Sequence, residues 1–95
     1  MNRIYAIRDT LAQALVGGLH LFKHDAAAVR FFTDVISDAQ TMLHRHPNDH
    51  ELICLGEVCD SGKDMSVDGF VGGPVVVITG SAWVASQTPK LEREA

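Results

Sequence analysis

The stretch from His44 to Val58 constrains the fold most, because a polar turn runs directly into the most strand-like apolar run of the chain. Pro47 fixes its own φ and disfavours helix at the residue before it, and the Asn48-Asp49 pair favours a turn. Four consecutive apolar residues follow and end at a glycine, which predicts a buried strand over residues 51–58. We therefore expect helix before this turn and a strand after it.

The clearest helix follows Asp25, whose carboxylate is expected to cap it. Three alanines come next, and apolar side chains then recur at three- and four-residue spacing on one face. This pattern predicts a helix over residues 26–37 that packs on a sheet. A second, short helix is expected over residues 39–45, capped by Asp38. Two of its side chains are expected to face inward: Met42 and Leu43.

Alternation and β-branched residues predict three further strands, over residues 3–8, 65–70 and 75–79. Residues 10–16 are ambiguous. Their propensity favours a helix, whereas the Gly17-Gly18 pair and the alternation that follows it favour a hairpin or extended arm over residues 12–22. The family resemblance described below favours the second interpretation.

Together these elements predict one α+β domain over residues 1–80, in which a small antiparallel sheet of about four strands packs against the helix at 26–37. Residues 81–95 are expected to form a tail that docks partly through Trp83 and is otherwise flexible. The run Val75–Ile78 is too apolar for a free sheet edge. We therefore expect a homo-oligomer that pairs through this strand, or burial of the strand under the tail.

Composition narrows the class of protein. With 46% hydrophobic and 21% charged residues, the 95-residue chain has an ordinary globular composition. A net charge of −4 argues against a protein that coats phosphate backbones in general, but leaves room for a local basic face. No run approaches the roughly 18 apolar residues that span a bilayer, and the N-terminus lacks a signal layout. We expect a cytoplasmic protein without a membrane partner.

The nucleophilic and metal-ligating side chains form no strong motif. Cys54 and Cys59 lie about 16 Å apart on one extended strand, so we expect free thiols in or near the core. The histidines at 44, 46 and 50 match no zinc pattern, and we expect them to be exposed or capping. Cys54 and His50 would lie about 13 Å apart, too far for a catalytic dyad. We expect no enzyme activity, no cofactor and no metal.

Nucleic-acid binding is the remaining class of function to consider. Proteins that bind single strands combine cations along a groove with aromatic faces on which bases stack. Arg3 and Tyr5 share one face of the predicted first strand. The candidates for phosphate or base contacts are Arg3, Tyr5, Arg8, Arg30 and Arg45. The alternative is that these charges are scattered solvated groups and that Tyr5 is half-buried.

Several short motifs, taken in their order along the chain, resemble a phage protein family. The motifs are Tyr5-Ala-Ile-Arg-Asp9, Ala28-Val-Arg-Phe-Phe32 with Asp34-Val35, and His46-Pro-Asn-Asp49 with Leu52, Leu55-Gly56 and Gly62. This order is similar to that in the small nonstructural protein encoded by the fifth reading frame of chlamydia-type and related microviruses, which are single-stranded DNA phages. The resemblance covers residues 4–63, and residues 64–95 match no motif of that family.

The resemblance implies a non-catalytic protein that binds single-stranded DNA during genome synthesis or packaging, in the cytoplasm of the infected bacterium. The chain departs from the family pattern at three places. Leu15 and the Gly17-Gly18 pair stand where an aromatic residue and prolines are expected, and His50 stands where a tyrosine is expected. The alternative function is a protein-interaction module, or a minor virion component, that contacts phage or host replication proteins without binding DNA.

Overall fold

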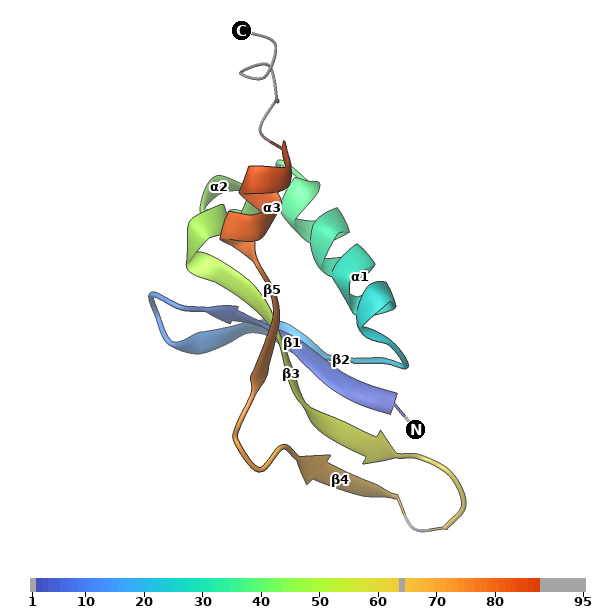
Figure 1. Ribbon diagram of the computed structural model, residues 1–95. Coiled ribbons are helices and arrows are strands. Elements are labelled where there is room, and N and C mark those ends of the chain that lie inside the picture. The colour runs from blue at the N-terminus through green and yellow to red at the C-terminus, as the bar shows by residue number, and fades with distance from the viewer. Residues whose placement is uncertain (1, 64, 88–95) are drawn as a thin grey trace, which may run out of the picture.

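The computed structural model describes residues 2–63 and 65–87 (Figure 1). Its elements in chain order are β1 (Asn2–Asp9), β2 (Ala14–Phe22), α1 (Asp25–Ser37), α2 (Met42–Arg45), the 3₁₀ turn η1 (Pro47–Asp49), β3 (His50–Cys59), β4 (Ser66–Gly69), β5 (Val75–Thr79) and α3 (Gly80–Gln87). The five strands form one antiparallel sheet. The predicted α+β class, with one main helix, is confirmed.

Strand β3 is the centre of the sheet. One of its edges pairs with β1 along nearly the whole strand, and β1 pairs in turn with β2. The other edge of β3 is shared, because β5 pairs with Glu51–Cys54 and β4 pairs with Gly56–Cys59. A side chain at Gly56 would not fit here, since its Cβ would lie 2.2 Å from the backbone oxygen of Asp68. The glycine that ends the apolar run therefore permits β4 to approach.

Residues 10–16 form a turn and the start of β2, so the helix that propensity favoured is wrong and the hairpin is right. Asp9 explains the outcome. Its Oδ1 accepts hydrogen bonds from the backbone amides of Leu11 and Ala12, each at 3.0 Å. An Asp side chain that bonds the backbone two and three residues ahead stabilises a turn at the expense of a helix. Gln13 completes the turn with φ at +55°.

The expected caps of the two predicted helices are both wrong. His24 occupies the N-cap position of α1 and makes no side-chain cap bond, while Asp25 lies in the first turn and bonds to β1 instead. Asp38 accepts a bond from the amide of Gln40, and the helix that follows begins only at Met42. Its cap is Thr41, whose Oγ1 accepts from the amide of His44 at 3.2 Å.

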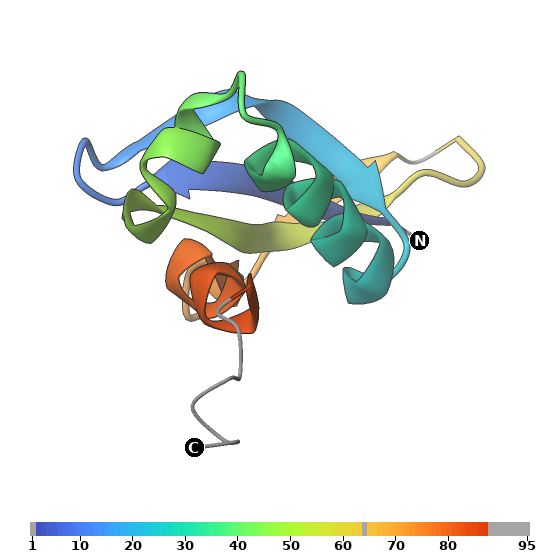
Figure 2. The same cartoon turned by 90° about the horizontal axis from the view of Figure 1, so that it is seen from above.

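Helices α1 and α2 cover one face of the sheet (Figure 2). The largest fully buried residues of this layer are Phe32 and Ile36 of α1, and the sheet contributes Tyr5 and Leu52 to the same core cluster. Leu43 of α2 is also buried, as predicted. Met42 is 42% exposed, contrary to the prediction, because the helix starts late and turns this side chain outward.

Helix α3 was not expected. Thr79 accepts a hydrogen bond from the amide of Ala82 and so starts the helix directly after β5. Gly80 allows the helix to pack on η1, because a Cβ at this position would lie 1.6 Å from the backbone oxygen of Pro47. Trp83 is partly buried and packs against the core cluster. The rest of the predicted tail, residues 88–95, lies outside the described residues.

Candidate functional site

Tyr5 and Arg3 converge on Asp25 at the start of α1. The Tyr5 hydroxyl donates a hydrogen bond to Oδ1 of Asp25, and Nη1 of Arg3 lies 3.3 Å from the same oxygen. Arg3 also places Nε 3.8 Å from a carboxylate oxygen of Glu57. Tyr5 and Arg3 therefore share a strand face, as predicted, but they contact the protein itself and fasten α1 to β1.

Tyr5 is fully buried, with 0% of the residue exposed. Burial raises the pKa of Tyr5 to about 12, and the hydrogen bond to Asp25 acts in the same direction. The ring packs edge-on against Phe22, with 5.9 Å between the ring centroids. Because neither face of the ring is exposed, the structure does not offer Tyr5 as a platform on which a base could stack.

Arg8 lies on the opposite face of β1 from Tyr5, as alternation along a strand requires. Its Nε donates a hydrogen bond of 2.8 Å to Oε2 of Glu51, the residue that pairs with it on β3. The side chain keeps 35% of its surface exposed and lines an open hollow of about 520 Å³ together with Thr10 and Gln13. A phosphate at this hollow would have to compete with Glu51 for the guanidinium group.

Arg30 and Arg45 are the two candidates whose side chains are exposed. Arg30 belongs to α1 and Arg45 ends α2, so both are part of the helical layer (Figure 1). The structure thus brings two of the five candidates together, Arg3 and Tyr5, and distributes the other three over different elements. Two further cations of the described chain, Lys23 and Lys63, are exposed in loops.

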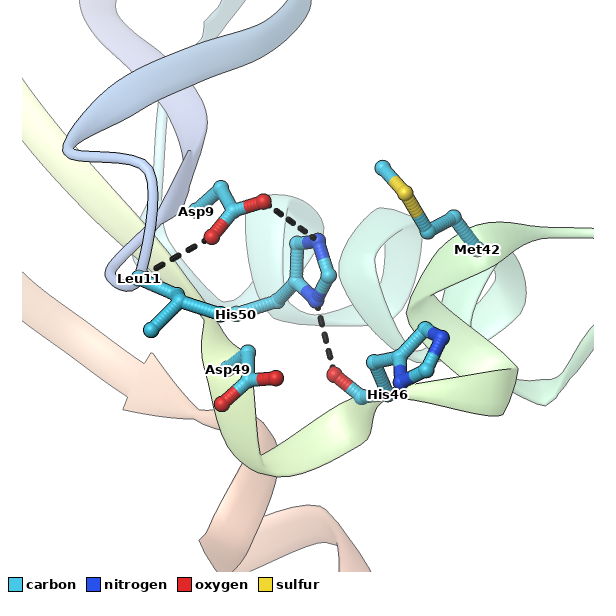
Figure 3. A pocket seen from close by; sticks show the side chains of 6 residues that line it. All are labelled: Asp9, Leu11, Met42, His46, Asp49 and His50. Atoms are coloured by element: carbon cyan, nitrogen blue, oxygen red, sulfur yellow. Dashed lines mark hydrogen bonds and ion pairs between the residues drawn. The ribbon is translucent and has the colours of Figure 1, made fainter.

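A smaller hollow of about 190 Å³ lies where β1 ends and β3 begins (Figure 3). Its lining residues are Asp9, Leu11, Met42, His46, Asp49 and His50. The ring of His50 lies between the carboxylate of Asp9 and the backbone oxygen of His46 (Figure 3). His50 is 2% exposed, so of the two expected environments, exposed or capping, the exposed one is wrong for this histidine.

The contacts of His50 define a structural role. Nδ1 lies 2.8 Å from the backbone oxygen of His46 and so acts as the donor. Nε2 lies 3.8 Å from Oδ2 of Asp9 and has no hydrogen-bond partner among the described residues. This nitrogen is itself buried, so the hollow does not present it to a ligand. Sequence reasoning missed the Asp9–His50 contact because its only signal is the pairing of the two residues across β1 and β3.

The other side chains with possible reactivity are also held within the fold. Both cysteines are free, as predicted, and Cys54 is buried beside Leu52 in the core. Burial raises the pKa of the Cys54 thiol, so little reactive thiolate forms there at neutral pH. His44 caps the end of α1 by placing Nδ1 3.0 Å from the backbone oxygen of Ile36. Within residues 2–63 and 65–87, no three His, Cys, Asp or Glu side chains are grouped so that they could hold a metal ion.

Large apolar side chains are exposed at both edges of the sheet. On β2 and the turn before it, the exposed residues are Leu11, Leu15, Leu19 and Leu21. Around β4 and β5, they are Met65, Val67, Val71, Val75 and Val76. Surfaces of this kind in a small protein mark contacts with other macromolecules more often than catalytic sites. No helix of the described chain is long and apolar enough to cross a membrane.

The described residues form a small α+β fold with exposed arginines in its helical layer and exposed apolar residues at its sheet edges. The sequence profile of the Phage ORF5 protein family matches residues 2–83, and the chain belongs to this family. The match extends about twenty residues beyond the recognised motifs, through β4 and β5 into α3, which corrects the view that residues after 63 match nothing. No curated protein and no solved structure gives a significant match.

Proposed function

We propose that this chain is a non-catalytic accessory protein of a microvirus-type phage that binds single-stranded DNA during genome synthesis or packaging, in the cytoplasm of the infected bacterium. The family match over residues 2–83 is the observation that carries the proposal. The order of the microvirus-like motifs, from Tyr5 to Gly62, supports its DNA-binding part.

The exposed arginines of the helical layer are the best candidates for the DNA contact. Arg30 and Arg45 are exposed on helices that cover the same face of the sheet (Figure 2). Arg3 and Arg8 already have carboxylate partners and would have to exchange them for phosphate. With two phosphates neutralised per copy, the log of the binding constant should fall against log salt with a slope of about −1.4. Such binding is weak and sensitive to salt, as the net charge of −4 requires.

Charge-neutralising variants test this assignment. Arg30→Gln and Arg45→Gln should each weaken binding to a fluorescein-labelled single-stranded oligonucleotide at low salt, and each should reduce the salt slope by about 0.7. Gln40→Glu is the matched control, because it also lowers the net charge by one at an exposed residue of the helical side. If the control weakens binding as much as the arginine variants do, the contact is not at these arginines.

A second candidate function is a protein-interaction module, or a minor virion component, that docks on phage or host replication proteins. The exposed apolar residues around β4 and β5 favour it, since Val67 is 67% exposed and Met65 is 73% exposed. The acidic net charge does not hinder such a role. If no single-stranded DNA is bound at low salt, this second function becomes the better account of the family.

A further inference from the structure

Strand β2 is the longest open edge of the sheet. It pairs with β1 on one side, and no described strand pairs with its other side. Its nine residues from Ala14 to Phe22 span about 30 Å at about 3.4 Å per residue. The opposite edge is divided between β4, with four residues, and β5, with five. The longest uninterrupted row of free backbone donors and acceptors among the described strands therefore lies along β2.

The sequence of β2 lacks the usual protection of an edge strand. Natural edges carry lysines or other charges, prolines or bulges that prevent pairing with another chain. Ala14–Phe22 contains no charged residue and no proline. It has one bulge, where the pairing with β1 shifts between Tyr5 and Ile7, and Gly17 adopts φ of +78° there. From His20 to Phe22 the strand runs in regular register with β1.

The two faces of β2 differ in what covers them. His20 and Phe22 face α1, where both rings contact Phe31 at centroid distances of 4.4 and 5.7 Å. By alternation, Leu19 and Leu21 point to the other face of the sheet, where they are 58% and 51% exposed. Leu15 lies on that same face and is 47% exposed. We call these three residues the β2 leucines.

We propose that two copies of this chain pair antiparallel through the second half of β2 around a two-fold axis, so that one sheet runs through both copies and Leu19 and Leu21 form the apolar centre of the contact. This inference does not depend on whether the protein binds DNA.

Self-complementarity argues for a second copy as the occupant. In a two-fold antiparallel pair the same strand lies on both sides of the axis. With His20 at the axis, residues 18–22 of the two copies pair, so that Leu19 lies opposite the partner's Leu21 and Leu21 lies opposite the partner's Leu19. Copies with a net charge of −4 repel each other, which favours an uncharged surface for a self-contact. Residues 10–22 contain no Asp, Glu, Lys or Arg.

The area that the edge of β2 offers to a second copy limits the expected strength of the dimer. The paired segment, residues 18–22, is about 17 Å long and about 10 Å high, and so offers about 170 Å² per copy before the leucine side chains are added. This is below the roughly 800 Å² per partner of a standard stable interface. We therefore expect a weak, reversible dimer.

The strand expected from sequence to self-associate, β5, is the weaker candidate. It follows Pro74 and leads at once into α3, so few of its backbone groups are available for pairing with another chain. Val77 and Ile78 also pack against the core of their own copy.

Sedimentation velocity from about 5 to about 500 µM tests the proposal. The mass of the wild type should rise from the monomer value of 10.3 kDa toward twice that value. Leu19→Lys combined with Leu21→Lys should stay monomeric throughout, because the two-fold pair brings four ammonium groups together. Val67→Lys combined with Val71→Lys is the matched control, since it adds the same two charges at exposed residues of β4 and the turn after it, and it should associate like the wild type. Far-UV circular dichroism checks that each variant is folded.

Amide hydrogen exchange of the wild type gives a measurement that needs no variant. The amides of residues 18–22 should exchange more slowly as protein concentration rises, while those of residues 75–79 should not change. A wild type that stays monomeric at about 500 µM would overturn the proposal and leave the β2 leucines to a different protein. So would a dimer that Val76→Lys abolishes and the leucine variant retains, or growth beyond two copies.

Discussion

At the scale of single residues, the contact between Tyr5 and Asp25 connects the first strand to the main helix. A buried hydroxyl that donates to a carboxylate is a charge-assisted hydrogen bond, which contributes about 1.5 to 3 kcal/mol. Asp25 keeps about half of its side chain exposed, which places this bond near the lower end of that range. Asp25, which was expected to cap α1, thus stabilises the fold through its hydrogen bond with Tyr5.

Tyr5→Phe isolates this contact. We expect the variant to lose about 1 to 2 kcal/mol in the free energy of unfolding at pH 8, because the hydroxyl is removed and the ring is kept. Urea unfolding followed by circular dichroism measures the difference. Unchanged stability would show that the hydroxyl contributes nothing.

The same pair predicts a dependence on pH. The pKa of Tyr5 is about 12 in the folded chain and 10 in the unfolded chain, so the folded state holds the proton more tightly. The resulting stability is complete below pH 10 and is lost as pH rises through about 12. Tyr5 is the only tyrosine, so the difference in unfolding free energy between wild type and Tyr5→Phe should shrink across this window. A constant difference would contradict the assigned pKa.

At the scale of elements, Gly80 determines how α3 meets the rest of the chain. The helix lies against η1 with no room for a Cβ at this position. Ser81 adds a hydrogen bond of 3.1 Å from its Oγ to Oδ1 of Asn48. The turn η1 is therefore also the surface on which α3 packs.

Gly80→Ala should move α3 away from η1. Overpacking of this kind costs about 1 to 3 kcal/mol in unfolding free energy, and Trp83, the only tryptophan, should shift its emission to longer wavelength as its burial decreases. Gly72→Ala is the control, because nothing lies within 4 Å of the added Cβ. Equal stability and equal emission in the two variants would show that α3 is not fixed at this point.

The local sequence pattern was sufficient to predict most helices and strands, but it did not predict the contacts between them. Strand β5 and helix α1 were predicted to within a residue, because β-branched density and helical spacing are local signals. The β2 hairpin competed with a helix of similar propensity, and the Asp9 side chain decided the outcome. Helix α3 was missed because its amphipathic pattern is weak and its stability comes from packing on η1.

The candidate site was harder to predict than the fold. Arg3 and Tyr5 were correctly placed on one strand face, but the sequence could not show that this face would meet Asp25 and be covered by α1. The burial of His50 depends in the same way on the register between β1 and β3. Such contacts join residues 20 to 41 positions apart, and no spacing along the chain indicates them.

At the scale of the whole molecule, charge and exposed surface point to binding through small, separate regions. Arg3 and Arg8 are each paired with a carboxylate, while Arg30 and Arg45 remain exposed. The apolar edges lie on the sheet, apart from these two arginines. The proposed DNA contact and the proposed self-association therefore use different surfaces, so mutations can test them separately.

Titration of a labelled single-stranded oligonucleotide with the wild-type protein, followed by fluorescence anisotropy at several salt concentrations and repeated with duplex, tests the central claim most directly. We expect micromolar binding that prefers the single strand and weakens with a slope of about −1.4 in log salt. Absence of binding at low salt, or equal binding of duplex, would contradict the proposed single-stranded DNA function.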